Sequence, residues 1–310
     1  MEKEEELRKW KSPESNVKGR RLRRREAVEG YLFIMPAMIP FLLFVLIPIV
    51  AAIALSFTNY DMLSAPDFVG VSNYMKLFGD KRMWISLWNS VRFMVLAVFI
   101  SNFLGLMLAL LINRKMSKAV SYFIRLCYFL PVIVAYAYIS IIWSNWLSKD
   151  TGVINYYLGL LGVEPIGWLV DPAISLYTIV LVDVWKNSGL AMIIYLAGLQ
   201  NINPELYEAA RLEGAHGWKL TWRITLPLLS PVLMFNLIIF MINAIQIFDP
   251  INLMTKGGPG DASRSIVLYI YDNFAQMKMG YSAAVSVVLF FILMILTLLE
   301  FKAGEKRVEY

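Results

Sequence analysis

Polar side chains interrupt one long apolar block of the sequence, residues 174–198. Near its middle stand five residues that can bond or pair: Asp183, Trp185, Lys186, Asn187 and Ser188. Such side chains are costly inside a membrane and face the interior of a helix bundle or a water-filled path. Asp183 and Lys186 are three residues apart, so on a helix they can pair with each other. Alternatively, Asp183, Trp185 and Asn187 line a path for a polar solute.

A second apolar block, 227–248, carries Asn236, Asn243 and Gln246. Asn243 and Gln246 share one helix face, and Asn236 lies nearly in line with Asn243 one heptad earlier. This stripe faces either the same path or a neighbouring helix, where amides hold membrane helices together. The sequence leaves both interpretations open.

The polar loop between these blocks, residues 199–226, predicts two short helices. Asn203 is a good N-cap, Pro204 suits the first helical position, and Gly214 is a natural C-terminal stop. A second helix is expected from about Trp218 to Thr225, leading into Pro227. Two adjacent small residues, Ala209 and Ala210, would let another surface approach the first helix closely.

The elements that position these residues are long apolar helices. Hydrophobic residues make up 58% of the 310 residues and charged residues 17%. A membrane-spanning helix needs about 20 mostly apolar residues. The sequence therefore predicts an all-α polytopic membrane protein with six spans, at 31–55, 89–112, 120–143, 174–198, 227–248 and 283–300. The first block is too long for a cleaved signal peptide and is expected to be an anchor.

Basic residues predict the orientation. The segments on one side, 1–30, 113–119, 199–226 and 301–310, hold 19 Lys and Arg residues, and the opposite segments hold 7. Because basic loops stay inside, both termini are expected in the cytoplasm. One membrane domain, 31–300, would then lie between a basic tail at 1–30, expected to be partly disordered or an interfacial helix, and a short tail at 301–310.

Several functions are excluded by what the sequence lacks. Cys127 is the single cysteine and His216 the single histidine, so neither a disulfide nor a cluster of metal-binding Cys and His residues can form. No Gly-x-x-x-x-Gly-Lys-[Ser/Thr] sequence occurs, so the chain does not bind nucleotide phosphates in the P-loop manner. The net charge of +6 comes from the membrane edges, which argues against a nucleic-acid partner.

The 199–226 loop resembles the EAA loop of ABC importer permeases. The match consists of Glu208-Ala209-Ala210, Gly214, and Ile224-x-Leu226-Pro227. In that family the loop forms a coupling helix that docks in a groove of the ATPase subunit. The resemblance assigns Glu208, Ala209, Ala210 and Gly214 to ATPase coupling. It also implies that the chain needs no cofactor itself, since partner subunits bind ATP and magnesium.

Two outer loops resemble carbohydrate importers of the maltose and glycerol-phosphate type. They are Phe248-Asp249-Pro250 with Leu253 to Gly260, and Phe68 to Tyr74. The resemblance implies a bacterial inner-membrane permease subunit for a sugar or oligosaccharide. Its expected partners are a second permease chain, two ATPase subunits, an external solute-binding protein and the lipid bilayer.

The same resemblance places Asp183, Trp185 and Asn187 at sugar-contacting positions, with Asn243 and Gln246 as further candidates on the next span. Lys186 replaces an apolar residue of the family. It would suit an anionic substrate, such as a uronide or a phosphate ester, if Asp183 does not neutralise it. The rival functions are a stand-alone secondary transporter or channel, a polytopic membrane enzyme, and an importer of amino acids or ions.

Overall fold

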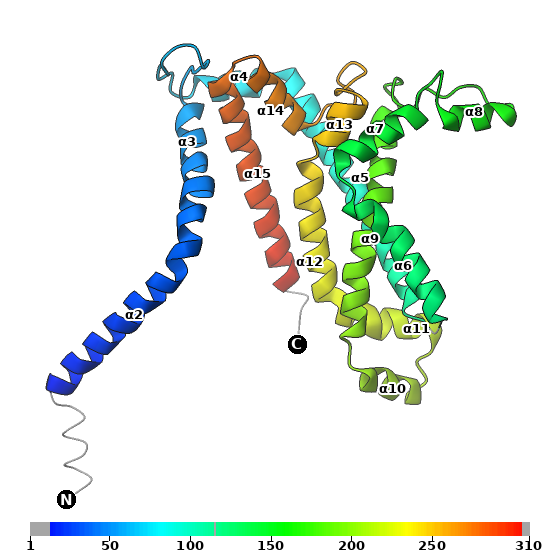
Figure 1. Cartoon of the computed structure of the whole chain (residues 1–310), viewed down its shortest axis with the longest axis horizontal. Helices are drawn as coiled ribbons and strands as arrows, with labels where there is room; N and C mark the ends of the chain where they lie inside the picture. Colours follow the sequence, from blue (N-terminus) through cyan, green and yellow to red (C-terminus); the bar gives the residue numbers. More distant parts are fainter. Residues whose placement is uncertain (1–12, 115, 306–310) are drawn as a thin grey trace, which may run out of the picture. The chain divides into compact units, whose positions relative to one another are not determined.

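The computed structural model describes residues 13–114 and 116–305, which fall into two compact units divided between Leu55 and Ser56 (Figure 1). The first unit is one helical stretch made of α2 (Pro13–Phe41), a π-helical turn η1 (Leu42–Leu46) and α3 (Ile47–Ser56), and its apolar part is Glu26–Ser56. Pro36 and Pro40 lie inside α2. Prolines remove helical hydrogen bonds, which accounts for an irregular turn directly after them. The expected basic tail is helical from Pro13, and its first twelve residues lie outside the described ones.

The second unit is also helical. Its elements in chain order are α4 (Ser72–Gly79), α5 (Lys81–Ile112), α6 (Lys118–Ile133), α7 (Tyr136–Trp146), α8 (Val153–Leu160), α9 (Ser175–Gln200), α10 (Pro204–Leu212), α11 (Gly217–Leu220), the π turn η2 (Thr221–Thr225), α12 (Leu226–Ile245), α13 (Asp249–Met254), α14 (Ile266–Ala275) and α15 (Met279–Glu305). The short helices α4, α8, α13 and α14 gather at one end of the bundle, and α10 and α11 at the other (Figure 1).

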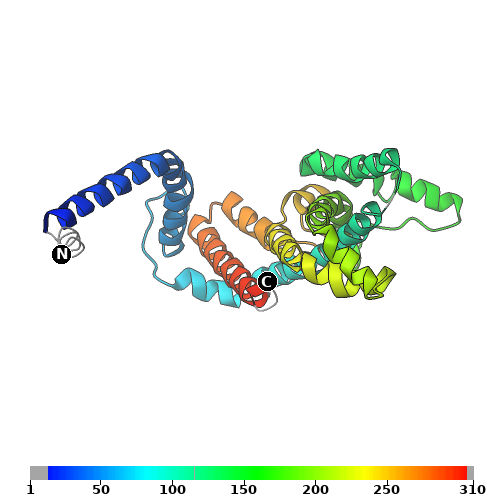
Figure 2. The same ribbon diagram turned by 90° about the horizontal axis from the view of Figure 1, so that it is seen from below.

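The expected spans all have counterparts among the described residues. Five helices are long and apolar enough to cross a membrane, and a sixth span results if the bent pair α6 and α7 is counted as one. The all-α polytopic fold is thus confirmed. Figure 2 looks along the bundle from the end that carries α10.

The third span differs from its prediction as one helix over 120–143. It is two helices bent by 100° at the short break before Tyr136. Pro131 lies in the last turn of α6, where it removes one helical hydrogen bond. Helix α6 continues through Pro131 to Ile133, and the break falls at Val134 and Ala135.

The centre of the bundle is the contact between α5 and α9, against which α12 and α6 also pack. Small residues bring these helices together, as is usual between membrane helices. A Cβ on Gly105 would lie 2.4 Å from the Ala191 Cβ, and one on Gly189 would lie 1.8 Å from the Tyr128 carbonyl oxygen. Neither glycine can therefore be replaced without moving a helix.

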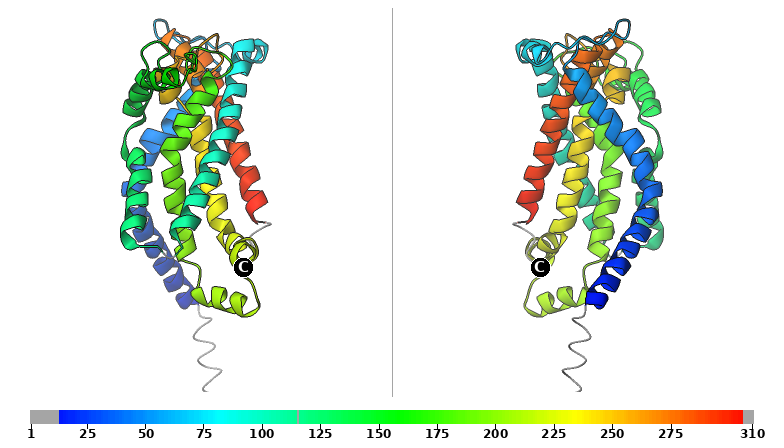
Figure 3. Two further views of the ribbon diagram at one scale, coloured as in Figure 1. Left: turned by 90° about the vertical axis from the view of Figure 1, so that its right-hand side faces the viewer. Right: turned by 90° about the vertical axis from the view of Figure 1, so that its left-hand side faces the viewer.

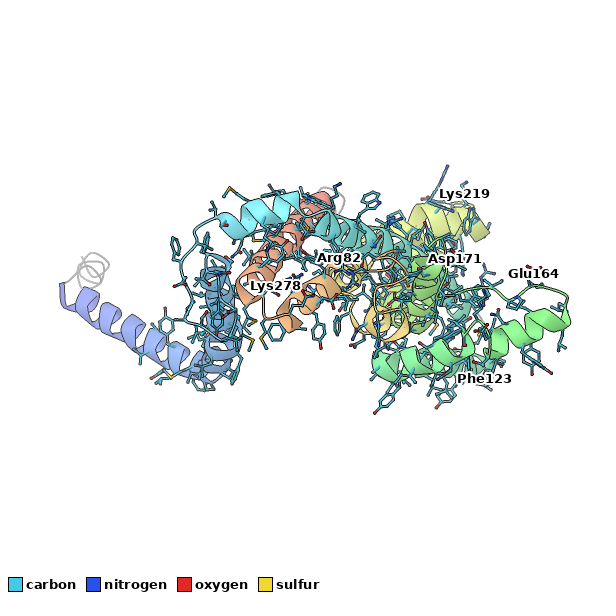
Figure 4. The ribbon with its side chains drawn as sticks, turned by 90° about the horizontal axis from the view of Figure 1, so that it is seen from above. Arg82, Phe123, Glu164, Asp171, Lys219 and Lys278 are labelled. Carbon is cyan, nitrogen blue, oxygen red and sulfur yellow. The ribbon has the colours of Figure 1, made fainter. Side chains whose placement is uncertain are left out.

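Polar contacts tie the loop at the α13 end to the start of α5. The Arg82 guanidinium donates to both oxygens of Asp261, at 2.7 and 2.9 Å. The Arg82 guanidinium, joined by Arg264, holds the pKa of the Asp261 carboxyl below its ordinary value. The Asp80 carboxylate accepts hydrogen bonds from the backbone N–H of Arg82, at 2.9 Å, and from the Tyr281 hydroxyl, at 2.9 Å. Figure 4 shows Arg82 within this end of the molecule.

Candidate functional site

A cavity of about 500 Å³ opens among the spans of the second unit. Its polar lining comes from four regions: the start of α7, the middle of α9, the end of α12, and the segment that follows α12. The polar lining residues are Tyr136, Asp183, Lys186, Asn187, Asn243, Gln246 and Asp249. Apolar side chains of α5, α9 and α12 complete the wall, as is usual for a pocket that binds a small molecule.

Asp183 is the centre of a hydrogen-bonded triad. Its Oδ1 atom accepts from the Tyr136 hydroxyl and, at 3.1 Å, from the Asn187 side-chain amide. The same amide donates to the Tyr136 oxygen at 2.5 Å. These bonds fix the three side chains in one orientation. Among the described residues nothing donates to the Asn187 Oδ1 or to the second oxygen of Asp183, so both are open acceptors.

Lys186 does not form the ion pair with Asp183 that its spacing suggested. Its ammonium group donates instead to the backbone carbonyls of Pro131, at 3.2 Å, and Val132, at 3.0 Å. It also lies 4.7 Å from the centroid of the Tyr136 ring. The last carbonyls of a helix have no partner within it. Lys186 therefore caps the C-terminal end of α6 at the break in the span.

The amides of α12 divide between the two roles that the sequence left open. Asn243 and Gln246 line the cavity. Asn236 is fully buried, and its amide donates to the Asn102 Oδ1 at 2.7 Å, which also accepts from the Tyr195 hydroxyl. Asn236 thus joins α12 to α5 and α9 and lies away from the cavity.

Trp185 is the one candidate of α9 that does not line the cavity. Its side chain is 43% exposed, and its ring packs edge-on against Trp143 with centroids 5.5 Å apart. The helical period gives the reason. Residues 183, 186, 187 and 190 lie on one face of α9, and a residue two positions after Asp183 lies on the other side.

The structure adds cavity residues that sequence reasoning ranked low or missed. Tyr136 lies at the start of α7, and its hydroxyl is part of the Asp183 triad. Asp249 entered the sequence analysis only as part of a loop motif, and Phe240 did not enter it; both line the cavity. The signal for Asp249 was available, because a carboxylate directly after a span points to a polar site at its mouth.

The 199–226 loop has the capping geometry that its sequence indicated. The Asn203 side chain accepts from the Glu205 N–H at 3.0 Å, and Pro204 begins α10. Gly214 has a φ of +81°, the left-handed conformation that favours glycine after a helix. The helix is held at the end of the bundle that is opposite to α13 and α14 (Figure 3).

The two alanines of this loop have different surroundings. Ala209 is exposed, whereas Ala210 is only 7% exposed and is buried against its own chain. Ala210 is therefore not accessible to another surface, whereas the approach of a partner at Ala209 stays a prediction. Glu208 is exposed and lines a groove of about 1200 Å³ between α10, α11 and the ends of α5 and α9.

Comparison with known proteins gives the family. Residues 101–308 match the family described as "Binding-protein-dependent transport system inner membrane component". The chain is 35% identical over 293 residues to the probable ABC transporter permease protein YesP of Bacillus subtilis, covering 93% of this chain and 94% of the relative. It is 34% identical over 290 residues to the trehalose/maltose transport system permease protein MalF of Thermococcus litoralis, covering 93% and 97%.

A solved structure supports the fold. It is a chain of a bacterial ABC transporter involved in the import of the acidic polysaccharide alginate, with a TM-score of 0.82 and 24% identity, and the match covers 93% of this chain and 100% of that one. The relatives are transport subunits and not enzymes, which excludes the membrane-enzyme alternative. The chain belongs to the binding-protein-dependent inner-membrane components, and it is a multi-pass permease subunit of an ABC transporter.

Proposed function

We propose that this chain forms half of the path by which an ATP-driven importer carries a sugar or oligosaccharide across the inner membrane. The observation that carries the proposal is the cavity around Asp183. Its open acceptors on Asp183 and Asn187, together with the amides of Asn243 and Gln246, suit the hydroxyl groups of a carbohydrate. Polar groups within spans are costly, so their convergence on one cavity marks a path. Relatives whose names refer to trehalose, maltose and lactose transport support the substrate class.

The charge of the cavity favours a neutral sugar. Two carboxylates, Asp183 and Asp249, line it, and the ammonium group of Lys186 is already bound by two carbonyl oxygens. An anionic sugar derivative is the second candidate. It is favoured by the solved alginate importer and by a relative named for sulfoquinovosyl glycerol transport.

Energy would come from two ATPase subunits that bind ATP and magnesium. Glu208, Ala209 and Gly214 are proposed to present α10 to one of them, with Ala210 anchoring the helix from within. A second permease subunit, of a different chain, would complete the path. The external binding protein would dock at the end that carries α4, α13 and α14. We expect the α10 side, and both termini, to lie in the cytoplasm, because the segments assigned to that side carry the excess of basic residues.

Uptake by cells that depend on this chain tests the proposal. A strain lacking the chain should fail to take up one carbohydrate from a panel of labelled neutral oligosaccharides and uronate oligosaccharides. Asp183→Leu and Asn187→Leu should reduce uptake of that substrate at least tenfold, since each removes an open acceptor worth about 1.4 kcal/mol or more. Trp185→Leu is the matched control on the far face of α9. Normal uptake by both cavity variants would contradict the assignment.

A further inference from the structure

The segment Gly217–Thr225, named here the interfacial segment, comprises α11 and the π turn η2. It continues into α12 without a gap in the helix, and the helical stretch beginning at Gly217 is 38 residues long and contains an apolar, span-length window. The 20 residues of α12 alone are about 30 Å long, which is the thickness of the hydrocarbon core. If α12 fills the hydrocarbon core, the interfacial segment begins where the core ends.

A bend turns the interfacial segment away from the axis of α12. The Leu226 N–H bonds the Thr221 carbonyl, five residues earlier, which is a π-helical bond. Pro227 follows at the start of α12 and would clash with a regular helical carbonyl at Arg223. π turns and prolines are the usual causes of helix bends. In Figure 1 the segment leaves the foot of α12 and runs crosswise to the spans.

Two exposed tryptophans mark one side of this segment. Trp218 is 61% exposed and Trp222 57% exposed. Their rings meet edge-on, with centroids 5.7 Å apart. Tryptophan is enriched at the depth where hydrocarbon meets headgroups, because its large ring is apolar and its N–H is polar. A pair of tryptophans one helical turn apart fits a helix lying in that layer.

Two exposed basic residues accompany the tryptophans. Lys219 and Arg223 each follow one of the tryptophans, so they too are one turn apart. The interfacial segment has no acidic residue. Neither basic side chain makes an ion pair with the residues that the structure describes. Figure 4 shows Lys219 projecting outward from the bundle.

The neighbouring helix α10 has a different surface. It carries Glu205 and Glu208 beside exposed Leu206 and Ala209, and it lies farther from the spans than α11 does (Figure 3). Acidic and small residues on a projecting helix suit a protein partner. Tryptophans and unpaired cations at the foot of a span suit a lipid surface instead.

We propose that the interfacial segment binds the headgroups of anionic phospholipids. The rings of Trp218 and Trp222 lie at the edge of the hydrocarbon, and Lys219 and Arg223 pair with lipid phosphates. This attachment holds the C-terminal end of the 199–226 loop at the membrane surface while α10 remains free to contact a partner. The proposal does not rest on the nature of the transported substrate.

Depth measurement tests where the segment lies. The full chain carrying Cys127→Ser is spin-labelled at Trp222→Cys or Trp218→Cys, so that each variant keeps the other tryptophan of this pair. A label at Leu212→Cys, whose residue is 91% exposed at the end of α10, is the control. The chains are reconstituted in vesicles of phosphatidylcholine and phosphatidylglycerol. Oxygen should enhance the spin relaxation of labels at 218 and 222 strongly, and a water-soluble nickel chelate should enhance it only weakly. Equal access of the chelate to labels at 212, 218 and 222 would overturn the proposal and assign the face to a protein partner.

Lipid titration tests the role of charge. Phosphatidylglycerol is titrated into the detergent-purified full chain, and retained lipid is measured by native mass spectrometry. Lys219→Gln combined with Arg223→Gln should weaken retention roughly 30-fold, since each basic residue near an anionic surface contributes about a factor of five. Lys149→Gln combined with Lys256→Gln, two exposed basic residues at the opposite end, should bind like the wild type. Equal retention by all three proteins would contradict the proposal.

Discussion

At the scale of single residues, Lys186 is a buried cation whose hydrogen bonds end a helix. Its ammonium group satisfies the carbonyls of Pro131 and Val132 at the break between α6 and α7. Lys186→Met should leave two buried acceptors without a donor and destabilise the chain by about 2–4 kcal/mol. Thermal unfolding of the purified chain in detergent measures this, with Lys149→Met at an exposed position as control. A wild-type unfolding temperature for Lys186→Met would show that the cap is dispensable.

The carboxyl group of Asp261 makes the stability of the end that carries α13 depend on pH. Its carboxyl pKa is lowered chiefly by the Arg82 guanidinium, so the folded chain holds this proton less tightly than the unfolded chain does. The contribution to stability is therefore present above the ordinary pKa of an aspartate and is lost as the pH falls through the folded-state value. Asp261→Asn should flatten the fall in unfolding temperature between about pH 5 and pH 3. Asp150→Asn, at an exposed position, should keep the wild-type profile; an unchanged profile for Asp261→Asn would disprove the role of the pair.

The sequence predicted most of the cavity at this scale and missed part of it for physical reasons. Four of its five path candidates line the cavity, and they stay proposals as substrate contacts. Trp185 was included because its residue type suits sugars, although the helical period already places it on the far side of α9. The ion pair of Asp183 and Lys186 was wrong because a broken helix from another span offers Lys186 two carbonyls, and no spacing rule can foresee that.

At the scale of elements, close helix contacts depend on glycines. Gly189→Ala would place a methyl group against the Tyr128 backbone and force α6 away from α9. We expect a loss of stability of at least about 2 kcal/mol, as is usual for overpacking against rigid neighbours. Gly159→Ala in α8 has open space around it and should be neutral or slightly stabilising. Unfolding in detergent compares the two variants, and equal stability would refute the packing argument.

The 199–226 loop depends on its turn after α10. Gly214 has a positive φ that proline cannot adopt, so Gly214→Pro should misplace α10. Glu208→Lys reverses the charge of the exposed face. Both variants should abolish ATP-dependent uptake while the chain still inserts into the membrane, as fractionation would show. Normal uptake by both would count against coupling through this loop.

Local rules predicted α10 well because its caps lie next to it in sequence. They predicted the third span poorly because its break involves a residue far away in the sequence. At the bend of 100°, the carbonyl of Val132 accepts a hydrogen bond from Lys186, which α9 contributes. A helix end that is capped by a side chain from a distant part of the sequence cannot be predicted from local sequence patterns.

At the scale of the whole molecule, the chain is a membrane subunit in which the cavity and α10, the two regions proposed to act in transport, are separated along the bundle. The cavity lies among the spans, and α10 lies beyond their ends (Figure 3). We therefore expect the cavity to bind the substrate and α10 to bind the ATPase subunits. Asp183→Leu should reduce uptake while ATPase subunits still bind, whereas Glu208→Lys should lose the ATPase subunits. Copurification of the ATPase subunits and uptake are measured on both variants. Loss of the ATPase subunits from Asp183→Leu as well as from Glu208→Lys would contradict this difference.

Coupling through α10 requires that separate ATPase subunits bind this chain. Purification of the tagged full chain from its native membrane, followed by identification of the retained proteins, measures this binding. We expect an ATPase subunit in amounts comparable to the chain, and its loss in Glu208→Lys, which still inserts into the membrane. Recovery of the wild-type chain without any ATPase subunit would show that no such subunit drives it.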